Sequence, residues 1–205
     1  MHPEALNEKG KEIFPKLKSF GDFCLAGGTA LALQLGHRIS VDFDFFSDKP
    51  IDRNLLPKVK RIFFEKTVSA SVNNQDELTV FVDEVKITFL HYPFSLVNDT
   101  IEYDEIKLLS IKEIAATKAY TIGRRGSLKD YVDLYFIISG SHATLNDIIE
   151  IAEKKYGNDF NSRLFLEQLI YIDDIEEAEI IFLKDKVSGD ALVVFFVEEI
   201  KKLKL

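Results

Sequence analysis

The chain has 205 residues, of which 46% are hydrophobic and 29% charged, which is typical of a soluble globular protein with one domain, or one domain and a helical appendage. Its formal net charge of −8 argues against binding nucleic acid through bulk electrostatics, and no apolar run is long enough to span a membrane. A single cysteine, Cys24, excludes an intrachain disulfide, and we expect a protein of the reducing cytoplasm.

The first half of the chain mixes helical and extended patterns. Residues 3–19 are helical in pattern, with a break at Pro15. Then we expect a strand at Phe23–Ala26, a helix at Ala30–Leu35, a strand at Val41–Phe46, a helix at Asp52–Glu65, strands at Thr67–Val72, Leu78–Val82 and Val85–Leu90, and an edge strand at Ile106–Leu109. Asp83-Glu84 forms a tight hairpin turn in this scheme. Residues 1–109 are therefore expected to form an α+β core, a mixed sheet with flanking helices.

Two carboxylates share one face of the expected strand Val41–Phe46. Side chains alternate along a strand, so Asp42 and Asp44 point the same way. The opposite, buried face carries Val41, Phe43 and Phe45. Adjacent carboxylates repel unless a cation lies between them, and Mg²⁺ (or Mn²⁺) accepts such oxygen ligands together with substrate phosphates. A solvated strand face is the alternative, which the flanking phenylalanines disfavour.

A glycine turn precedes this strand by one short helix. Gly27-Gly28-Thr29 opens the helix Ala30–Leu35, where backbone N–H groups and the positive end of the helix dipole suit a phosphate. By itself the turn is better explained as a sharp strand-to-helix connection. With two carboxylates close behind it, we favour the approach of a phosphate.

The second half of the chain is helical in pattern. Ser110 and Glu113 have capping-box spacing and open a helix that we expect to end at Ile122, before Gly123. The further helices expected are Leu128–Ser139, Leu145–Tyr156, Phe160–Tyr171 and Gly189–Lys204. Residues 110–205 are thus predicted to be a helical region that packs on the core and completes a cleft.

Basic residues gather in the first two of these helices. Between Lys107 and Lys129 there are six basic residues and one acid, which suits a small anionic substrate or a short stretch of RNA. Lys118 lies among small and apolar residues, where it either has a function or snorkels from a buried helix. Lys129, Asp130 and Asp133 are three and four apart and can approach one another, and a surface ion-pair cluster is the plainer explanation.

These motifs together resemble a known family. The ordered set of glycine turn, short helix and D-x-D strand resembles the DNA polymerase beta-like nucleotidyltransferase superfamily. More narrowly, GGTALAL…HRISVDFDFF is similar to the AbiEii/AbiGii-type toxin nucleotidyltransferases of bacterial abortive-infection and toxin–antitoxin systems. The later family motifs, a lysine on one helix and R-x-x-x-[KR]-D-x-x-D-L at the start of the next, match Lys118 and the segment Arg125–Leu134.

The resemblance implies a nucleotidyltransferase-like fold and a transfer of nucleoside monophosphate from NTP. The acceptor would be the 3′ end of a tRNA or a protein side chain, and a separate antitoxin would neutralise the toxin. The implied metal ligands are Asp42 and Asp44. The implied catalytic residues are Asp42, Asp44, Lys118, Asp130 and Asp133. The implied nucleotide-binding residues are Gly27, Gly28, Thr29, Arg38, Ser40, Lys118, Arg125 and Lys129, although Arg38 is as well explained by a pair with Asp42.

The sequence departs from the superfamily pattern at one point. Polymerase beta-like transferases commonly take a third carboxylate from a later strand, and the strand Val85–Leu90 offers Lys86 and Thr88 instead. Asp83 and Glu84 are poorly placed for the role, because they lie in the hairpin. The alternative function is therefore a catalytically degenerate nucleotide-binding or partner-binding module. Another possibility is a helical half that binds a partner protein through the acidic run Asp173–Glu179.

Overall fold

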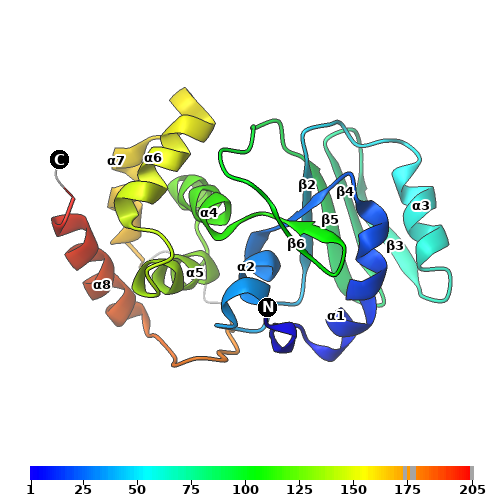
Figure 1. Ribbon diagram of the computed structural model, residues 1–205, viewed down its shortest axis with the longest axis horizontal. Coiled ribbons are helices and arrows are strands. Elements are labelled where there is room, and N and C mark those ends of the chain that lie inside the picture. The colour runs from blue at the N-terminus through cyan, green and yellow to red at the C-terminus, as the bar shows by residue number, and fades with distance from the viewer. Residues whose placement is uncertain (173–174, 176–178, 204–205) are drawn as a thin grey trace. The chain divides into compact units, whose positions relative to one another are not determined.

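The computed structural model describes residues 1–172, 175 and 179–203, with Arg125 described by its backbone only. The chain divides into two compact units (Figure 1). The first consists of Met1–Ser95 and Asp99–Leu109, and the second of Leu96–Asn98 and Ser110–Leu205. In the described residues, no helix is long and apolar enough to cross a membrane.

The first unit is built on a mixed sheet, which confirms the predicted α+β fold class. Within the described residues seven strands form it, in the order β3-β4-β5-β2-β1-β7-β6. The strands are β1 (Cys24–Ala26), β2 (Phe43–Ser47), β3 (Val68–Asn73), β4 (Glu77–Val82), β5 (Val85–His91), β6 (Ile101–Tyr103) and β7 (Ile106–Leu108). β2 is parallel to β5 and β1 is parallel to β7, while the other neighbours are antiparallel.

Short helices surround this sheet. They are the 3₁₀ helices η1 (Pro3–Ala5) and η2 (Phe14–Phe20), and the α-helices α1 (Glu8–Ile13), α2 (Gly27–Leu35) and α3 (Leu55–Ile62). The helical pattern predicted for residues 3–19, with a break at Pro15, corresponds to three short helices in the structure, and the change from α1 to η2 falls next to Pro15. Pro15 falls in the first turn of η2, where its missing N–H and fixed φ are tolerated.

Two predictions about strands are wrong. The strand at Ile106–Leu108 is not at an edge, because the unpredicted β6 pairs with it through a turn at Asp104-Glu105. β2 begins at Phe43, and Val41 is 42% exposed instead of buried. The segment before Phe43 bonds to helices instead: the Asp42 carbonyl accepts from the Thr29 hydroxyl of α2, and the Ser40 N–H donates to the Ala5 carbonyl of η1 at 2.8 Å.

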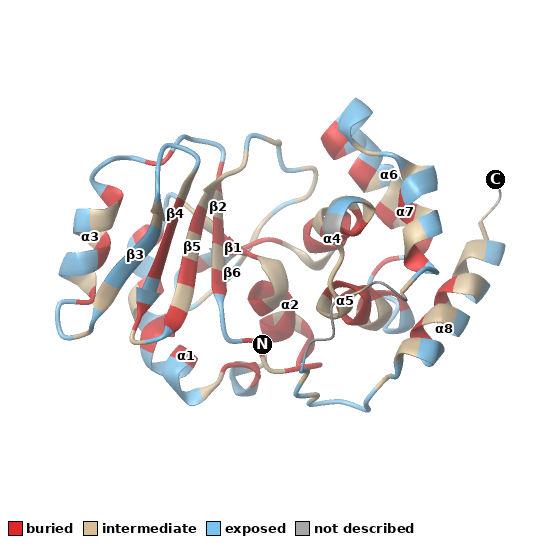
Figure 2. Ribbon diagram, turned by 180° about the vertical axis from the view of Figure 1, so that it is seen from behind, coloured by how far each residue is buried: buried red, intermediate tan, exposed pale blue. Residues whose placement is uncertain are grey.

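The core of the first unit is aromatic. Phe45 stacks on Phe89 with ring centroids 5.4 Å apart, and Phe20 lies 4.8 Å from Phe89. Buried residues follow β4, β5, β2 and α2, whereas β3 is largely exposed (Figure 2). Side chains along β2 and β5 alternate between two faces of the sheet. One face is buried, and the other, which carries Asp44 and Thr88, is half-buried.

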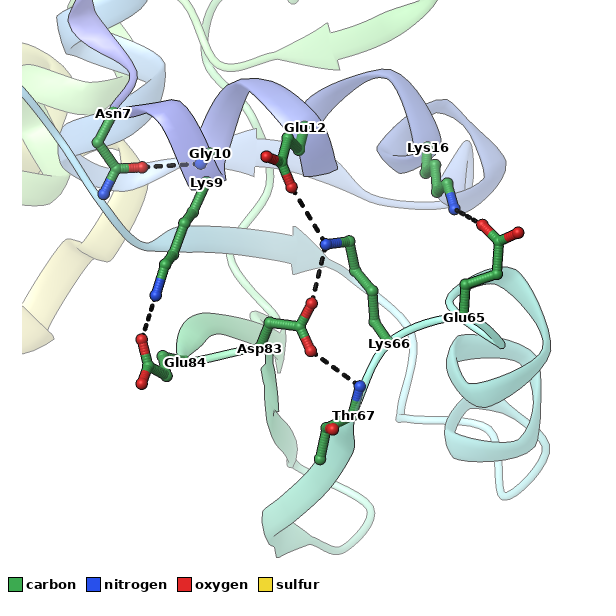
Figure 3. Close-up of polar contacts among 10 residues, drawn as sticks. All are labelled: Asn7, Lys9, Gly10, Glu12, Lys16, Glu65, Lys66, Thr67, Asp83 and Glu84. Carbon is green, nitrogen blue, oxygen red and sulfur yellow. Dashed lines mark hydrogen bonds and ion pairs between the residues drawn. The ribbon is translucent and has the colours of Figure 1, made fainter.

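The turn between β4 and β5 is held by ion pairs (Figure 3). Lys66 donates to Asp83 at 2.8 Å and to Glu12 at 3.2 Å, and Lys9 pairs with Glu84. The hydrogen bond from Lys66 and then the N–H of Thr67 hold the pKa of Asp83 below its ordinary value. These contacts hold Asp83 at the residues just before β3 and Glu84 at α1. The strand Val85–Leu90 itself carries no acid.

The second unit is helical, as predicted. Its helices are α4 (Ile111–Arg125), α5 (Leu128–Ser139), α6 (Leu145–Tyr156), η3 (Gly157–Asp159), α7 (Ser162–Leu169) and α8 (Gly189–Lys201). Gly123 does not end α4, since a glycine inside a helix lowers stability by only about 1 kcal/mol. Most of the acidic run Asp173–Glu179, at 173–174 and 176–178, lies outside the described residues.

A buried ion pair fixes the start of α4. The Ser110 hydroxyl accepts from the Glu113 N–H at 3.4 Å, but the Glu113 carboxylate does not return to the cap as a capping box requires. It accepts instead from the N–H groups of Val97 (2.6 Å) and Asn98 (2.7 Å) and pairs with Lys155 of α6. Burial alone would raise the pKa of Glu113, but Lys155 and the two N–H groups outweigh it and hold that pKa low.

Candidate functional site

The glycine turn and one of the two predicted metal ligands lie against each other in the first unit. Ala26 pairs with Asp44 across β1 and β2, so the start of α2 follows directly beside that carboxylate. Gly27 has φ +64°, and a Cβ placed there would lie 2.6 Å from Asp44 Oδ2. Position 27 therefore requires glycine for two reasons, its backbone conformation and the closeness of the Asp44 carboxylate.

Two predicted nucleotide-binding residues, Thr29 and Ser40, use their hydroxyl groups to hold the backbone. Thr29 and Ser40 are buried, with their side-chain oxygens 2.8 Å apart, and Thr29 also reaches the Asp42 carbonyl. This network fixes the segment that enters β2 against the first turn of α2. It leaves the Asp42 residue exposed and Asp44 half-buried, so the two predicted ligands differ in setting.

The donor set of this region fits a hard divalent cation. Two carboxylates supply oxygen, the element that Mg²⁺ prefers. Within the part of the chain that the structure describes, no group of three or more His, Cys, Asp or Glu side chains is arranged to hold a metal ion. The region therefore fits an ion that completes its shell with water and substrate phosphates, and it does not fit a closed protein cage.

Arg38 and Thr88 differ in their surroundings. Arg38 is 3% exposed, and its Nη1 donates to the Ile39 carbonyl at 3.2 Å. Thr88 pairs with Asp44 in the parallel register of β2 and β5, so the two side chains are neighbours on one face. The residue beside Asp44 on the adjacent strand is thus a hydroxyl and not a carboxylate.

The second unit brings together three other predicted residues. Lys118 of α4 lies 2.7 Å from Asp130 Oδ1 and 2.7 Å from Asp133 Oδ2, both on α5. The three side chains are 10%, 12% and 0% exposed, so the plainer explanation of a surface ion-pair cluster is wrong for them. In the described residues Lys129 forms no ion pair with either carboxylate, and the Arg125 side chain lies outside them.

Asp130 has a second task that the family motif does not indicate. Its Oδ2 accepts from the N–H and the hydroxyl of Ser127, each at 2.9 Å, which forms a capping box at the start of α5. The neighbouring Tyr131 is buried, and burial, followed by the charge of Asp130, raises its pKa to about 12. The spacing Ser127-x-x-Asp130 is the signal available in the sequence. One carboxylate therefore both caps α5 and holds Lys118.

Comparison with known proteins identifies a family and a related protein. The family model described as "Nucleotidyl transferase AbiEii toxin, Type IV TA system" matches residues 12–193. An uncharacterized protein of Aquifex aeolicus (strain VF5) is 33% identical over 180 residues, which are 84% of this chain and 85% of that protein.

Solved structures share the fold at low sequence identity. MenT4, a nucleotidyltransferase toxin of Mycobacterium tuberculosis H37Rv, has a TM-score of 0.61 at 16% identity, covering 94% of this chain and 81% of that one. JHP933 from Helicobacter pylori has a TM-score of 0.53 at 16% identity and covers 96% of each chain. With the family model matching most of its length, this chain belongs to the nucleotidyl transferase AbiEii toxin family of type IV toxin–antitoxin systems.

Proposed function

We propose that this protein transfers a nucleoside monophosphate from an NTP to an acceptor in a reaction that depends on Mg²⁺ or Mn²⁺. The observation that carries the proposal is the closeness of the Asp44 carboxylate to Gly27, the first residue of α2, which has φ +64° and leaves no room for a Cβ. A backbone that can approach phosphates and a carboxylate that can hold their counterion are thereby adjacent.

Each residue has a distinct part in this proposal. Asp42 and Asp44 would hold the divalent ion, which when bound supplies charge neutralisation for the triphosphate. The N–H groups at Gly27 and Gly28 bind phosphate oxygens, and Thr29 with Ser40 keeps the turn and the entry to β2 in place. Arg38, a buried cation, offsets phosphate charge.

The second unit supplies further charged residues to the reaction. Lys118 interacts with the phosphates, and Asp130 and Asp133 orient it from two sides. Arg125 and Lys129 are proposed as additional nucleotide-binding residues. The acceptor is an RNA such as the 3′ end of a tRNA, or a protein side chain, and a cognate antitoxin protein opposes the activity.

A label-transfer experiment tests the proposal. The protein is incubated with each α-³²P-labelled NTP, with Mg²⁺ or with EDTA, in the presence of total RNA or of a cell protein fraction. We expect label on a macromolecule for at least one NTP, only with the metal. Absence of transfer under every combination, with NTP binding intact, would contradict the proposal and favour the degenerate module.

A second candidate is a nucleotide-binding or partner-binding module that has lost catalysis. The observation that favours it is the pairing of Asp44 with Thr88 where a third carboxylate is expected. Calorimetric titration with each NTP, with and without Mg²⁺, separates the two, since binding without any transfer is the signature of this second candidate.

A further inference from the structure

A row of oxygen-bearing side chains crosses the sheet beside Asp44. Asp44 on β2 pairs with Thr88 on β5, and Thr88 pairs with Thr79 on β4, so all three share one face. Thr79 Oγ1 lies 3.3 Å from Thr88 Oγ1 and 2.5 Å from Oε1 of Glu77. The row therefore runs from the Glu77 carboxylate through two hydroxyls to Asp44, the proposed ligand of the metal.

The Glu77 carboxylate sets the direction of the hydrogen bonds in this row of side chains. An ionised carboxylate only accepts hydrogen bonds, so the single hydroxyl proton of Thr79 points to Glu77. The Thr79 and Thr88 hydroxyl oxygens lie 3.3 Å apart, and because Thr79 has no second proton, a hydrogen bond between them has Thr88 as its donor. Thr79 is 3% exposed, so water competes little for these contacts. With its proton directed at Thr79, Thr88 keeps oxygen lone pairs that can bind a cation, and strand register makes Thr88 the neighbour of Asp44.

We propose that Thr88 is an oxygen ligand of the divalent ion next to Asp44, and that Thr79 and Glu77 are positioning residues that orient its hydroxyl. This inference rests on the proposed function, because it assumes that the ion binds at Asp44. A neutral hydroxyl oxygen is a hard donor and takes the place of the third carboxylate without adding a like charge beside Asp44. The departure from the superfamily pattern is thus a substitution of one oxygen ligand by another.

A cross-strand threonine pair also stabilises sheets by itself, so the test must separate metal affinity from stability. The probe is Mn²⁺, titrated by electron paramagnetic resonance with and without a non-hydrolysable NTP analogue, and thermal unfolding is measured for every variant. Thr88→Val removes the oxygen at nearly constant volume, Thr88→Ser retains it, and Thr79→Val breaks the orienting chain while leaving Thr88 intact. Ser71→Ala is the matched control, since Ser71 lies on the neighbouring strand β3 and its hydroxyl donates to the Thr79 carbonyl at 3.4 Å, not to the Thr79 hydroxyl.

The expected result is a loss of about tenfold in Mn²⁺ affinity for Thr88→Val, the lower end of the range for groups that complete or orient a metal site. For Thr79→Val, which leaves the Thr88 oxygen in place, we expect a smaller loss of about threefold, below that range. Thr88→Ser and Ser71→Ala bind within about twofold of the wild type, a span that corresponds to less than one hydrogen bond. If Thr88→Val does not fold, the Thr79→Val titration decides.

The inference is overturned if Thr88→Val binds Mn²⁺ with wild-type affinity. If Thr88→Val does not fold, wild-type affinity of a folded Thr79→Val overturns it. The Asp44→Asn variant separates this failure from a failure of the proposed function. If the wild type binds Mn²⁺ and Asp44→Asn does not, the metal site stands and only the role of Thr88 falls. If the wild type binds no Mn²⁺ under either condition, both proposals fall.

Discussion

A side chain at position 27 would meet the carboxylate of Asp44 before it met anything else, because the nearest atom to a methyl group placed there is Asp44 Oδ2. The constraint comes from the pairing of Ala26 with Asp44 across two short strands, which places the backbone of the turn beside that acid. The turn and the carboxylate are consequently one structural unit. Changing either should disturb both stability and the binding of phosphates.

Gly27→Ala tests this coupling. A non-glycine residue at φ +64° costs about 1–2 kcal/mol, and the methyl group must also displace Asp44. We expect a loss of unfolding free energy of at least that size in urea denaturation, together with weaker NTP binding by calorimetry. Gly21→Ala is the control, since Gly21 has φ −61° and open space around it. Equal effects of the two substitutions would contradict the coupling.

Thr88→Asp tests what a third carboxylate does beside Asp44. Two acids on adjacent strands repel, so we expect a lower melting temperature without metal than in the wild type. Mn²⁺ should raise the melting temperature of this variant more than that of the wild type, because binding to the folded state stabilises it in proportion to affinity. Ser71→Asp, on the exposed strand β3, serves as the charge control. An Mn²⁺-induced shift no larger than in the wild type would contradict this expectation.

At the scale of the elements, the buried pair of Glu113 and Lys155 joins α4 to α6 and holds the segment at Val97 and Asn98. Its pH dependence follows from the lowered pKa of Glu113. A carboxyl whose pKa is depressed in the folded state contributes stability that is fully present above its unfolded pKa, about 4.3. That contribution is lost as the pH falls through the folded-state pKa.

Glu113→Ala should destabilise the protein by about 3–5 kcal/mol at pH 7, because it leaves the buried Lys155 charge without its partner. The difference from the wild type should shrink in denaturation measured below about pH 4. Glu167→Ala, which breaks the exposed pair with Arg163, should change stability by about 0.5 kcal/mol or less. A Glu113→Ala effect as small as this control would show that the pair carries little stability.

Elements defined by local signals can be predicted from the sequence, and elements defined by distant pairing cannot. The prediction for α6 is correct to the residue, and that for α5 places its start directly after Ser127, because caps and turns are encoded within a few residues. The prediction lacks β6, although Asp104-Glu105 repeats the Asp83-Glu84 turn, with positive φ at all four positions. Three residues are too few for alternation to be visible.

The candidate site shows the same division. The D-x-D motif and the glycine turn are visible in the sequence, but the contact between Gly27 and Asp44 depends on strand register. The register that sets Thr88 beside Asp44 joins strands that are far apart in the chain. The helical pattern places Lys118 among small and apolar residues, and only the packing of α4 on α5 shows that it is held by Asp130 and Asp133.

At the scale of the whole molecule, the proposed reaction uses charged residues from both units. If Asp42 of the first unit and Lys118 of the second serve one reaction, their substitutions should be non-additive. We expect the transfer rate of the double variant Asp42→Asn/Lys118→Arg to match the slower single variant. The control combines Asp42→Asn with Arg163→Ala, whose side chain is 88% exposed. A double variant slower by the product of the two single losses would contradict a shared reaction.

The most direct test of the central claim is Mg²⁺-dependent label transfer from NTP by Asp44→Ala, measured beside the wild type. Asp48→Ala is the matched control, because Asp48 is an exposed acid just after the same strand. We predict that Asp44→Ala abolishes transfer while remaining folded, and that Asp48→Ala transfers label at the wild-type rate. Full activity of Asp44→Ala would contradict the claim that this carboxylate holds the metal ion.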